Sequence, residues 1–273
     1  MNMNISQEHK RSGIQVQSVA RALSIIKCFQ TASELGITEI SEMLHLNKST
    51  VFGLVNTLSG YGYLEQVRGS RKYRLGLALF ELGHLVLSRM DICGEAKEAC
   101  IPLAAKYQAT VHIATHTEGE VVYLDKIDRG NSLVTISNVG KRLPMYCCGV
   151  GKAMLAFLSE EYLEKYIFNK PLKKITPNTV TQKDVLLKQL AQVKKSRIAF
   201  DREEIEEGLC CIASPILQRD GFPEIAISLS FPYGKIKKID RKEAEEAVLA
   251  CAAKLSARLG YHPPSSTPQK ERF

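Results

Sequence analysis

No run of apolar residues in this 273-residue chain approaches the ~20 that a membrane-spanning helix needs. The opening residues, MNMNISQEHKRS, are polar and lack the apolar core of an export signal. The eight cysteines form no CxxC pair, so zinc-finger spacing is absent, and free thiols are typical of a reducing compartment. We therefore expect a cytoplasmic protein with no membrane partner, no metal and no cofactor.

A nucleotide-binding loop is also incomplete. Gly151 and Lys152 follow a glycine-containing turn and precede an apolar helix, which is part of the Walker A pattern. That pattern needs a glycine and a serine or threonine where this chain has Tyr146 and Ala153. The sequence therefore argues against an NTP-binding enzyme.

Two other chemistries stay open as alternatives. A Cys/His hydrolase could use Cys211 with His112 or His116, although the spacing offers no support for a nucleophile and base pair. Zinc could bind the pairs at 147–148 and 210–211, or a mixed Cys/Asp set could hold a metal. Neighbouring cysteines on a strand point to opposite faces, so four thiolates do not converge easily. We expect no enzyme activity.

A helix-turn-helix is indicated by residues 36–60, which read GITEISEMLHLNKSTVFGLVNTLSG. Ile40 and Leu44 lie one turn apart on the first predicted helix, and the second predicted helix also has an apolar face. That face consists of Val51, Leu54, Val55 and Leu58. DNA binding is the leading hypothesis, and an ordinary helical hairpin within a core is the alternative.

The opposite face of the second helix is predicted to enter a major groove. Asn47 is a suitable N-cap residue, and the outward positions are Ser49, Phe52, Gly53 and Asn56. A phenylalanine at this place could touch a thymine methyl group or support the helix. The predicted DNA contacts of this helix are Lys48, Ser49, Thr50, Phe52 and Asn56.

The flanking residues complete the pattern of a winged helix. Residues 18–30 predict a helix capped by Ser18, with a core-facing stripe of Val19, Ala22, Leu23, Ile26 and Phe29. Residues 63–66 and 73–75 predict a β-hairpin with a basic turn. Arg68, Arg71 and Lys72 are candidate phosphate contacts, with a solvated charged loop as the alternative. A net charge of +8 also favours an anionic partner.

The chain is long enough for two domains, and we predict an α+β multidomain fold. The winged helix-turn-helix spans 16–75, a linker helix spans 76–92, and a second domain spans 93–260 between flexible tails at 1–15 and 261–273. The linker is apolar on more than one face, which favours packing against a second subunit. The elements predicted for the second domain are a helix at 95–107, strands at 110–115, 120–127 and 132–139, helices at 151–158, 161–167 and 184–195, strands at 198–201, 209–217 and 224–231, and a helix at 241–259.

Small residues of the second domain suggest a ligand pocket. Strand alternation over 225–231 places Ala226, Ser228 and Ser230 on one face and bulky residues on the other. The segment 147–152 is a glycine-containing turn before a helix, whose free N–H groups favour a carboxylate. Asp201 and Cys211 could face the same cavity if their strands are central. A capping aspartate and a core cysteine are the alternatives.

Six segments together resemble the IclR family of bacterial transcriptional regulators over about residues 16–260. They are SVARALSII, ITEISEMLHLNKSTV, YRLGLALFELG, RLPMYCCGVGKAMLAFL, AFDREEIEEGLCCIASPI and AISLSFP. The resemblance implies a winged helix-turn-helix, a linker helix that takes part in dimerisation, and a GAF-like effector domain with an antiparallel sheet flanked by helices. It also implies operator binding as a dimer or a dimer of dimers, and favours repression.

The family's effector site, carried over motif by motif, comprises Leu143, Gly149, Val150, Asp201, Leu209, Cys211, Ser228 and Ser230. Family effectors are often small carboxylates, sugar acids or aromatic acids, so we expect an effector-responsive repressor that senses such an acid. The chain departs from the family pattern at Phe52 and Gly53, because an arginine usually follows the aromatic residue. A ligand-sensing module that acts through protein contacts, with altered or lost DNA recognition, is therefore the alternative function.

Overall fold

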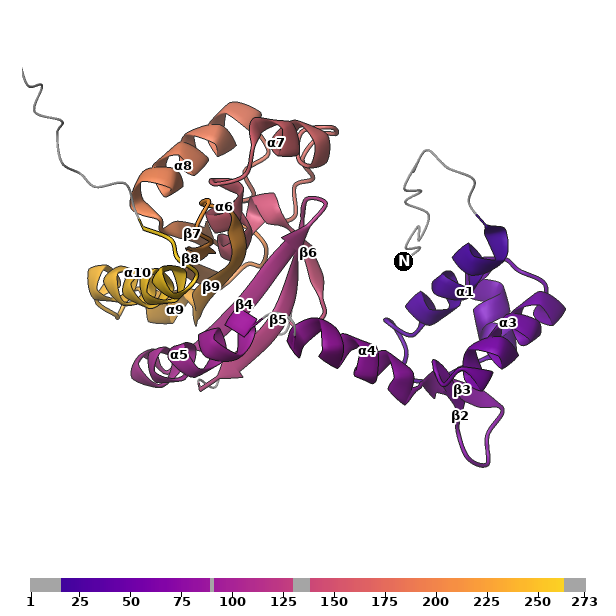
Figure 1. Cartoon of the computed structure of the whole chain (residues 1–273). Helices are drawn as coiled ribbons and strands as arrows, with labels where there is room; N and C mark the ends of the chain where they lie inside the picture. The colour runs from indigo at the N-terminus through magenta and orange to yellow at the C-terminus, as the bar shows by residue number, and fades with distance from the viewer. Residues whose placement is uncertain (1–15, 89–90, 130–137, 263–273) are drawn as a thin grey trace, which may run out of the picture. The chain divides into compact units, whose positions relative to one another are not determined.

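A computed structural model of the chain describes residues 16–88, 91–129 and 138–262. The chain divides into two compact units, Met1–Arg89 and Met90–Phe273 (Figure 1). The tails predicted at 1–15 and 261–273 lie outside the described residues, except for Tyr261 and His262. Within the described ranges, no helix is long and apolar enough to cross a membrane.

The first unit is a winged helix. Its elements are α1 (Gln17–Cys28), β1 (Leu35–Gly36), α2 (Ile37–Leu44), α3 (Lys48–Gly60), β2 (Leu64–Gln66), β3 (Lys72–Leu75) and α4 (Leu77–Ser88). The three strands form an antiparallel sheet in the order β1-β3-β2. Ile40, Val51 and Val55 are fully buried, so the predicted helix-turn-helix packs through the predicted face. The predicted hairpin is confirmed, and β1 adds a third strand too short to be seen in the sequence pattern.

The predicted packing of α1 was wrong in two respects. Its N-cap residue is Val16, not Ser18, and no side chain makes a capping hydrogen bond. Of the predicted stripe, Phe29 is buried as predicted, but Val19 and Leu23 are 56% and 55% exposed. The helix itself faces the core through Ile25 and Cys28, which were not predicted. Helix α1 is apolar around more than one face, so periodicity alone does not decide which stripe turns inward. Asn47 does precede α3, but its side chain makes no capping hydrogen bond.

The second unit contains a six-stranded antiparallel sheet in the order β6-β5-β4-β9-β8-β7. The strands are β4 (Thr110–Thr117), β5 (Glu120–Asp128), β6 (Arg142–Pro144), β7 (Ala199–Arg202), β8 (Leu209–Leu217) and β9 (Pro223–Pro232). The helices are α5 (Asp91–Tyr107), η1 (Met145–Cys147), α6 (Gly149–Leu155), α7 (Glu160–Tyr166), α8 (Lys183–Ser196), α9 (Tyr233–Ile236) and α10 (Arg241–Arg258).

Both faces of this sheet are covered (Figure 1). On one face α5 and α10 pack on the bulky side chains of β9, which include Ile225, Ile227, Leu229 and Phe231. On the other face lie η1 and helices α6 to α8. Ala226 belongs to this second face, so the predicted alternation of bulky and small residues along β9 is confirmed.

Some predicted boundaries differ from the structure. The helix predicted at 151–158 begins earlier and ends earlier, at Gly149–Leu155, and its Gly151 packs closely on η1. A Cβ atom on Gly151 would lie only 2.2 Å from the carbonyl oxygen of Met145. The strand predicted at 198–201 is Ala199–Arg202. The strand predicted at 132–139 falls largely outside the described residues, and the short strand β6 was not predicted.

Candidate DNA-binding face and effector pocket

The outward face of α3 is open to solvent as predicted. Lys48, Ser49 and Asn56 are exposed, Phe52 is 57% exposed, and Thr50 is half-buried. Phe52 therefore stands on the surface and does not support the core. An added Cβ atom at Gly53 would meet no atom within 4 Å, so the glycine leaves a gap on this face.

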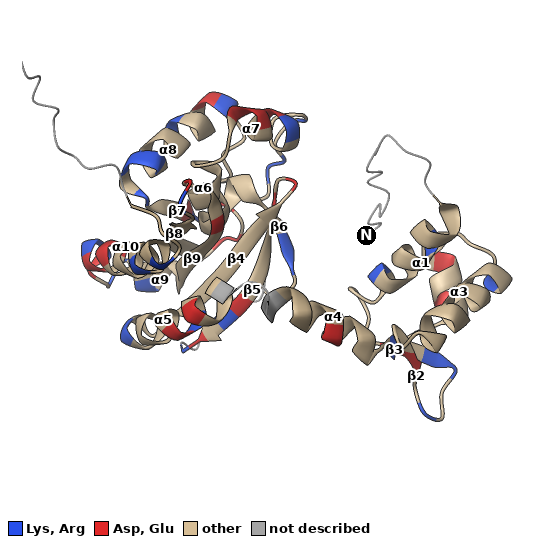
Figure 2. Cartoon of the chain, in the orientation of Figure 1, with Lys and Arg blue, Asp and Glu red and all other residues tan. Residues whose placement is uncertain are grey.

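The wing has a basic tip (Figure 2). Arg68 and Arg71 are exposed, and Gly69 adopts a φ of 74°, which lets the β2–β3 turn reverse sharply. Lys72 differs from these arginines, because its ammonium lies 3.2 Å from the Glu39 carboxylate of α2. That ion pair joins the wing to the helix-turn-helix and competes with phosphate contact by Lys72.

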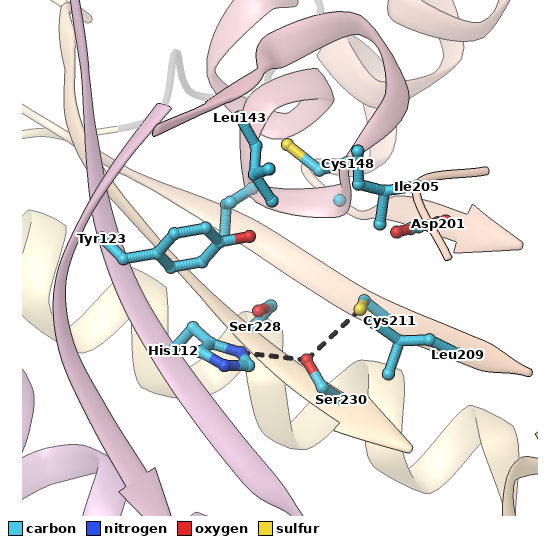
Figure 3. Close-up of a pocket in the computed structure, with 12 residues that line it drawn as sticks. His112, Tyr123, Leu143, Cys148, Asp201, Ile205, Leu209, Cys211, Ser228 and Ser230 are labelled. Carbon is cyan, nitrogen blue, oxygen red and sulfur yellow. Dashed lines mark hydrogen bonds between the residues drawn. The ribbon is translucent and has the colours of Figure 1, made fainter. Parts of the chain in front are cut away.

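The candidate effector pocket, called the effector pocket below, lies on the face of the sheet covered by α6 (Figure 3). Asp201 of β7 is opposite Cys211 of β8, which is opposite Ser230 of β9. Ser228 lies two residues before Ser230 on the same face. Antiparallel pairing thus brings these predicted residues side by side from three strands.

The opposite wall of the pocket comes from β6 and the start of α6. Leu143, Gly149 and Val150 line it, and Leu209 completes the predicted set. All eight predicted effector residues therefore line one cavity. An added Cβ atom on Gly149 would lie 3.3 Å from the Cβ atom of Cys211, so glycine allows α6 to approach the sheet closely.

Four further lining residues were not predicted as effector contacts: His112, Tyr123, Cys148 and Ile205. His112 Nδ1 lies 3.0 Å from the Ser230 hydroxyl, and the rings of His112 and Tyr123 meet edge to face at 5.2 Å. The Tyr123 hydroxyl points into the pocket (Figure 3). Alternation along 110–115 could have signalled His112, because it places this residue on the same face as Thr110 and Ala114.

Burial keeps the histidine and cysteine side chains of the pocket uncharged at neutral pH. It lowers the pKa of His112 to about 3 and raises the pKa of the Cys211 thiol well above its usual range. Ser230 stands between them, 3.2 Å from Cys211 Sγ, so no thiolate–imidazolium pair forms. This arrangement does not fit the hydrolase alternative.

Asp201 is the ionisable carboxyl group of the pocket. Burial raises its pKa to about 7, although the Glu204 N–H and the positive charge of Lys152 act in the opposite direction. Its Oδ1 accepts that N–H at 2.8 Å, whereas Oδ2 has no hydrogen-bond partner among the described residues. Asp201 therefore has an oxygen available for a ligand donor, and it takes up a proton near neutral pH.

The cavity itself is small, at about 10 Å³. That volume is close to the space of a single water molecule. The cavity in this state therefore has no room for an organic acid, and binding one requires it to widen. The described residues that line it include no lysine or arginine, so hydroxyl and backbone N–H groups would have to bind a carboxylate.

The Lys152 side chain is buried and forms an ion pair. Its ammonium lies 2.5 Å from Glu204, and the two side chains are 3% and 5% exposed. This ion pair, together with the incomplete Walker A spacing, leaves the lysine no role in phosphate binding. Across the described ranges, no group of three or more His, Cys, Asp or Glu side chains is placed to hold a metal ion.

A winged helix joined to a domain with a small polar pocket defines a ligand-responsive DNA-binding regulator. The IclR helix-turn-helix family matches residues 18–68, and the family described as bacterial transcriptional regulator IclR C-terminal matches residues 84–257. The chain belongs to the IclR family of transcriptional regulators, which is non-enzymatic.

Curated relatives cover nearly the whole chain. The HTH-type transcriptional regulator KdgR of Escherichia coli K12 is 34% identical over 247 residues, which are 90% of this chain and 94% of that protein. The DNA-binding transcriptional repressor YiaJ of the same organism is 27% identical over 249 residues, 90% of this chain and 88% of that protein.

Solved structures share the fold. The Thermotoga maritima IclR structure has a TM-score of 0.74 at 28% identity and covers 89% of this chain and 99% of its own. An IclR homolog from Microbacterium hydrocarbonoxydans, solved with 4-hydroxybenzoate, has a TM-score of 0.78 at 23% identity and covers 89% and 99%. The second likeness concerns the fold alone.

Proposed function

We propose that this protein is a repressor that binds operator DNA as a homodimer or a dimer of dimers and responds to a small organic acid. The observation that carries the proposal is that the eight effector residues implied by the family resemblance all line one buried cavity. Its DNA contacts are Lys48, Ser49, Thr50, Phe52 and Asn56 on α3, with Arg68 and Arg71 on the wing. Lys72 contributes there only if its ion pair with Glu39 opens. Operator binding places the protein in the cytoplasm.

The pocket favours an acid that carries hydroxyl groups, such as a sugar acid or an aromatic hydroxy acid. Ser228, Ser230 and Tyr123 bring hydroxyls to the cavity, and Gly149 and Val150 line it from the first turn of α6, whose N–H groups have no acceptor within the helix. Among the described residues, the lining has no lysine or arginine. With a pKa of about 7, Asp201 accepts a hydrogen bond when ionised and donates one when protonated. A fold relative solved with 4-hydroxybenzoate is an example of such an acid in this architecture.

Dimerisation is supported by the exposed apolar residues of the first unit. Leu77, Phe80, Leu85 and Val86 of α4 are exposed, and so is Val19 of α1. Exposed large apolar side chains along one helix are typical of an interface. In a dimer, a change in the effector domains would alter the spacing of two recognition helices, and affinity depends on that spacing.

Effector control is tested by a DNA-binding titration with a panel of acids that includes 4-hydroxybenzoate and D-glucuronate. We expect at least one acid to weaken binding of the wild-type chain to the DNA upstream of its own gene, because the ligand selects a state with an opened pocket. The double variant Ser228→Ala, Ser230→Ala should lose that response. The matched control is Ser214→Ala, since Ser214 is buried on β8 but donates to the Arg197 carbonyl instead of lining the pocket. An unchanged response in the double variant would refute the assigned pocket.

A second candidate function is a ligand-sensing module that acts through protein contacts. Gly53 favours it, because the outward face of α3 lacks a side chain at this place. Binding to the upstream DNA that is steeply weakened by salt would exclude it, since a protein contact rarely releases so many counterions.

A further inference from the structure

A second cleft lies in the same unit, where helix α8 passes the edge strand β7. Its volume is about 360 Å³, within the range of small-molecule sites. It shares no lining residue with the effector pocket. The cleft is therefore a separate cavity on the outer edge of the sheet.

The wall contributed by α8 is polar. Gln189, Gln192 and Ser196 lie three or four residues apart, so they share one helix face, and all three line the cleft. The buried face of the same helix carries Leu186 and Leu190, which is the usual composition where a helix packs on a sheet. The Ser196 hydroxyl bonds to the backbone of Gln192 and Ile198, and Gln189 Oε1 accepts from Lys152 at 3.4 Å. The two side-chain amides still have N–H groups to donate, which favours a polar ligand.

The floor of the cleft holds the Lys152–Glu204 ion pair. One Glu204 oxygen, Oε1, accepts from Lys152 at 2.5 Å and from the Arg202 N–H at 3.4 Å. The other, Oε2, has no hydrogen-bond partner among the described residues, although Glu204 is 4% exposed. A buried acceptor without a partner costs free energy, which a hydroxyl donor would recover.

Arg202 stands at the rim of the cleft with its charge unpaired. Its guanidinium lies over the Phe200 ring at 5.2 Å, and within the described part of the chain it makes no ion pair. Stacking on the ring holds the planar guanidinium in place, and its paired N–H groups match a carboxylate. Two cations, Lys152 and Arg202, and one carboxylate, Glu204, leave the cleft with one net positive charge.

We propose that this cleft is a second ligand site, which binds a hydroxylated carboxylic acid. The ligand carboxylate pairs with Arg202, one hydroxyl donates to Glu204, and the amides of Gln189 and Gln192 hold the remaining hydroxyls. The site goes beyond the proposed function because it gives the regulator a second input. The Glu204 N–H donates to Asp201 at 2.8 Å, so the turn that forms this site also positions the effector pocket.

The proposal is tested by calorimetric titration of D-gluconate into the full chain that carries Ser228→Ala and Ser230→Ala. These changes lie in the effector pocket, so binding that remains belongs elsewhere. We expect one gluconate per chain, and at least tenfold weaker binding when Arg202→Gln is added. Lys194→Gln removes the same charge from the exposed last turn of α8 outside the cleft, and should change the affinity less than twofold.

Three results would overturn the proposal. They are no saturable binding of gluconate, loss of binding through the serine changes alone, and equal weakening by Arg202→Gln and Lys194→Gln. D-sorbitol has the hydroxyls without the carboxylate and should bind at least tenfold more weakly; equal binding would remove Arg202 from the site. Thermal melting of each variant checks that it is folded.

Discussion

The buried carboxyl of Asp201 makes a quantitative prediction about pH. Its pKa rises from 3.8 to about 7 on folding, so the folded state binds the proton more tightly than the unfolded state. The resulting stability is fully present below the unfolded pKa and is lost as pH rises through about 7. One pKa unit corresponds to about 1.4 kcal/mol, so the wild type should lose about 2.5 kcal/mol from this group between pH 5 and pH 8.

The variant Asp201→Asn removes this titration while keeping an oxygen to accept the Glu204 N–H. Between pH 5 and pH 8, we expect the free energy of unfolding to fall by about 2.5 kcal/mol less in the variant than in the wild type. Urea unfolding at four pH values gives both profiles, and the contributions of other groups cancel in the difference. Asp184→Asn is the control, because Asp184 is exposed in the first turn of α8. Parallel profiles for Asp201→Asn and the wild type would refute the reasoning.

Further predictions concern the glycines and the buried ion pair. Gly53→Ala should stabilise the first unit by up to about 1 kcal/mol, since an added Cβ atom meets no other atom there. Gly53→Arg should tighten DNA binding and steepen its salt dependence, and gel-shift titration would measure both. Gly151→Ala should unfold at much lower urea, because its Cβ atom would lie 2.2 Å from the Met145 carbonyl oxygen; an unchanged midpoint would contradict this close packing. Lys152→Met should cost about 3–5 kcal/mol by leaving Glu204 buried without its cation, and adding Glu204→Gln should recover part of that loss in the same assay.

The sequence predicts residues of the effector pocket where small and bulky residues alternate along a strand, so that one face of the strand carries only small side chains. Ser228 and Ser230 follow that rule on β9, and the register of the sheet then brings Cys211 and Asp201 beside them. His112 follows the same rule on β4, where it shares a face with Thr110 and Ala114, although residues 110–114 are all buried and burial alone does not single it out. Tyr123 resembles an ordinary core aromatic in its sequence, so its role depends on the tertiary structure.

In the first unit, prediction of burial succeeds where a helix has a single apolar face. Helices α2 and α3 each have one such face, and the sequence predicts correctly that Ile40, Val51 and Val55 are buried. Helix α1 has apolar residues on two sides, so periodicity does not distinguish the core stripe from the exposed one at Val19. The ion pair of Lys72 joins residues far apart in the chain, and no local pattern predicts it.

The salt dependence of binding to the DNA upstream of the protein's own gene tests the central claim most directly. Fluorescence anisotropy at increasing salt should give an affinity that falls steeply on a logarithmic scale, because basic side chains of α3 and the wing displace counterions. Lys48→Ala should weaken binding and reduce the slope by about one. Undetectable binding, or an affinity that changes neither with salt nor on Lys48→Ala substitution, would contradict a DNA-binding regulator that reads its operator through α3.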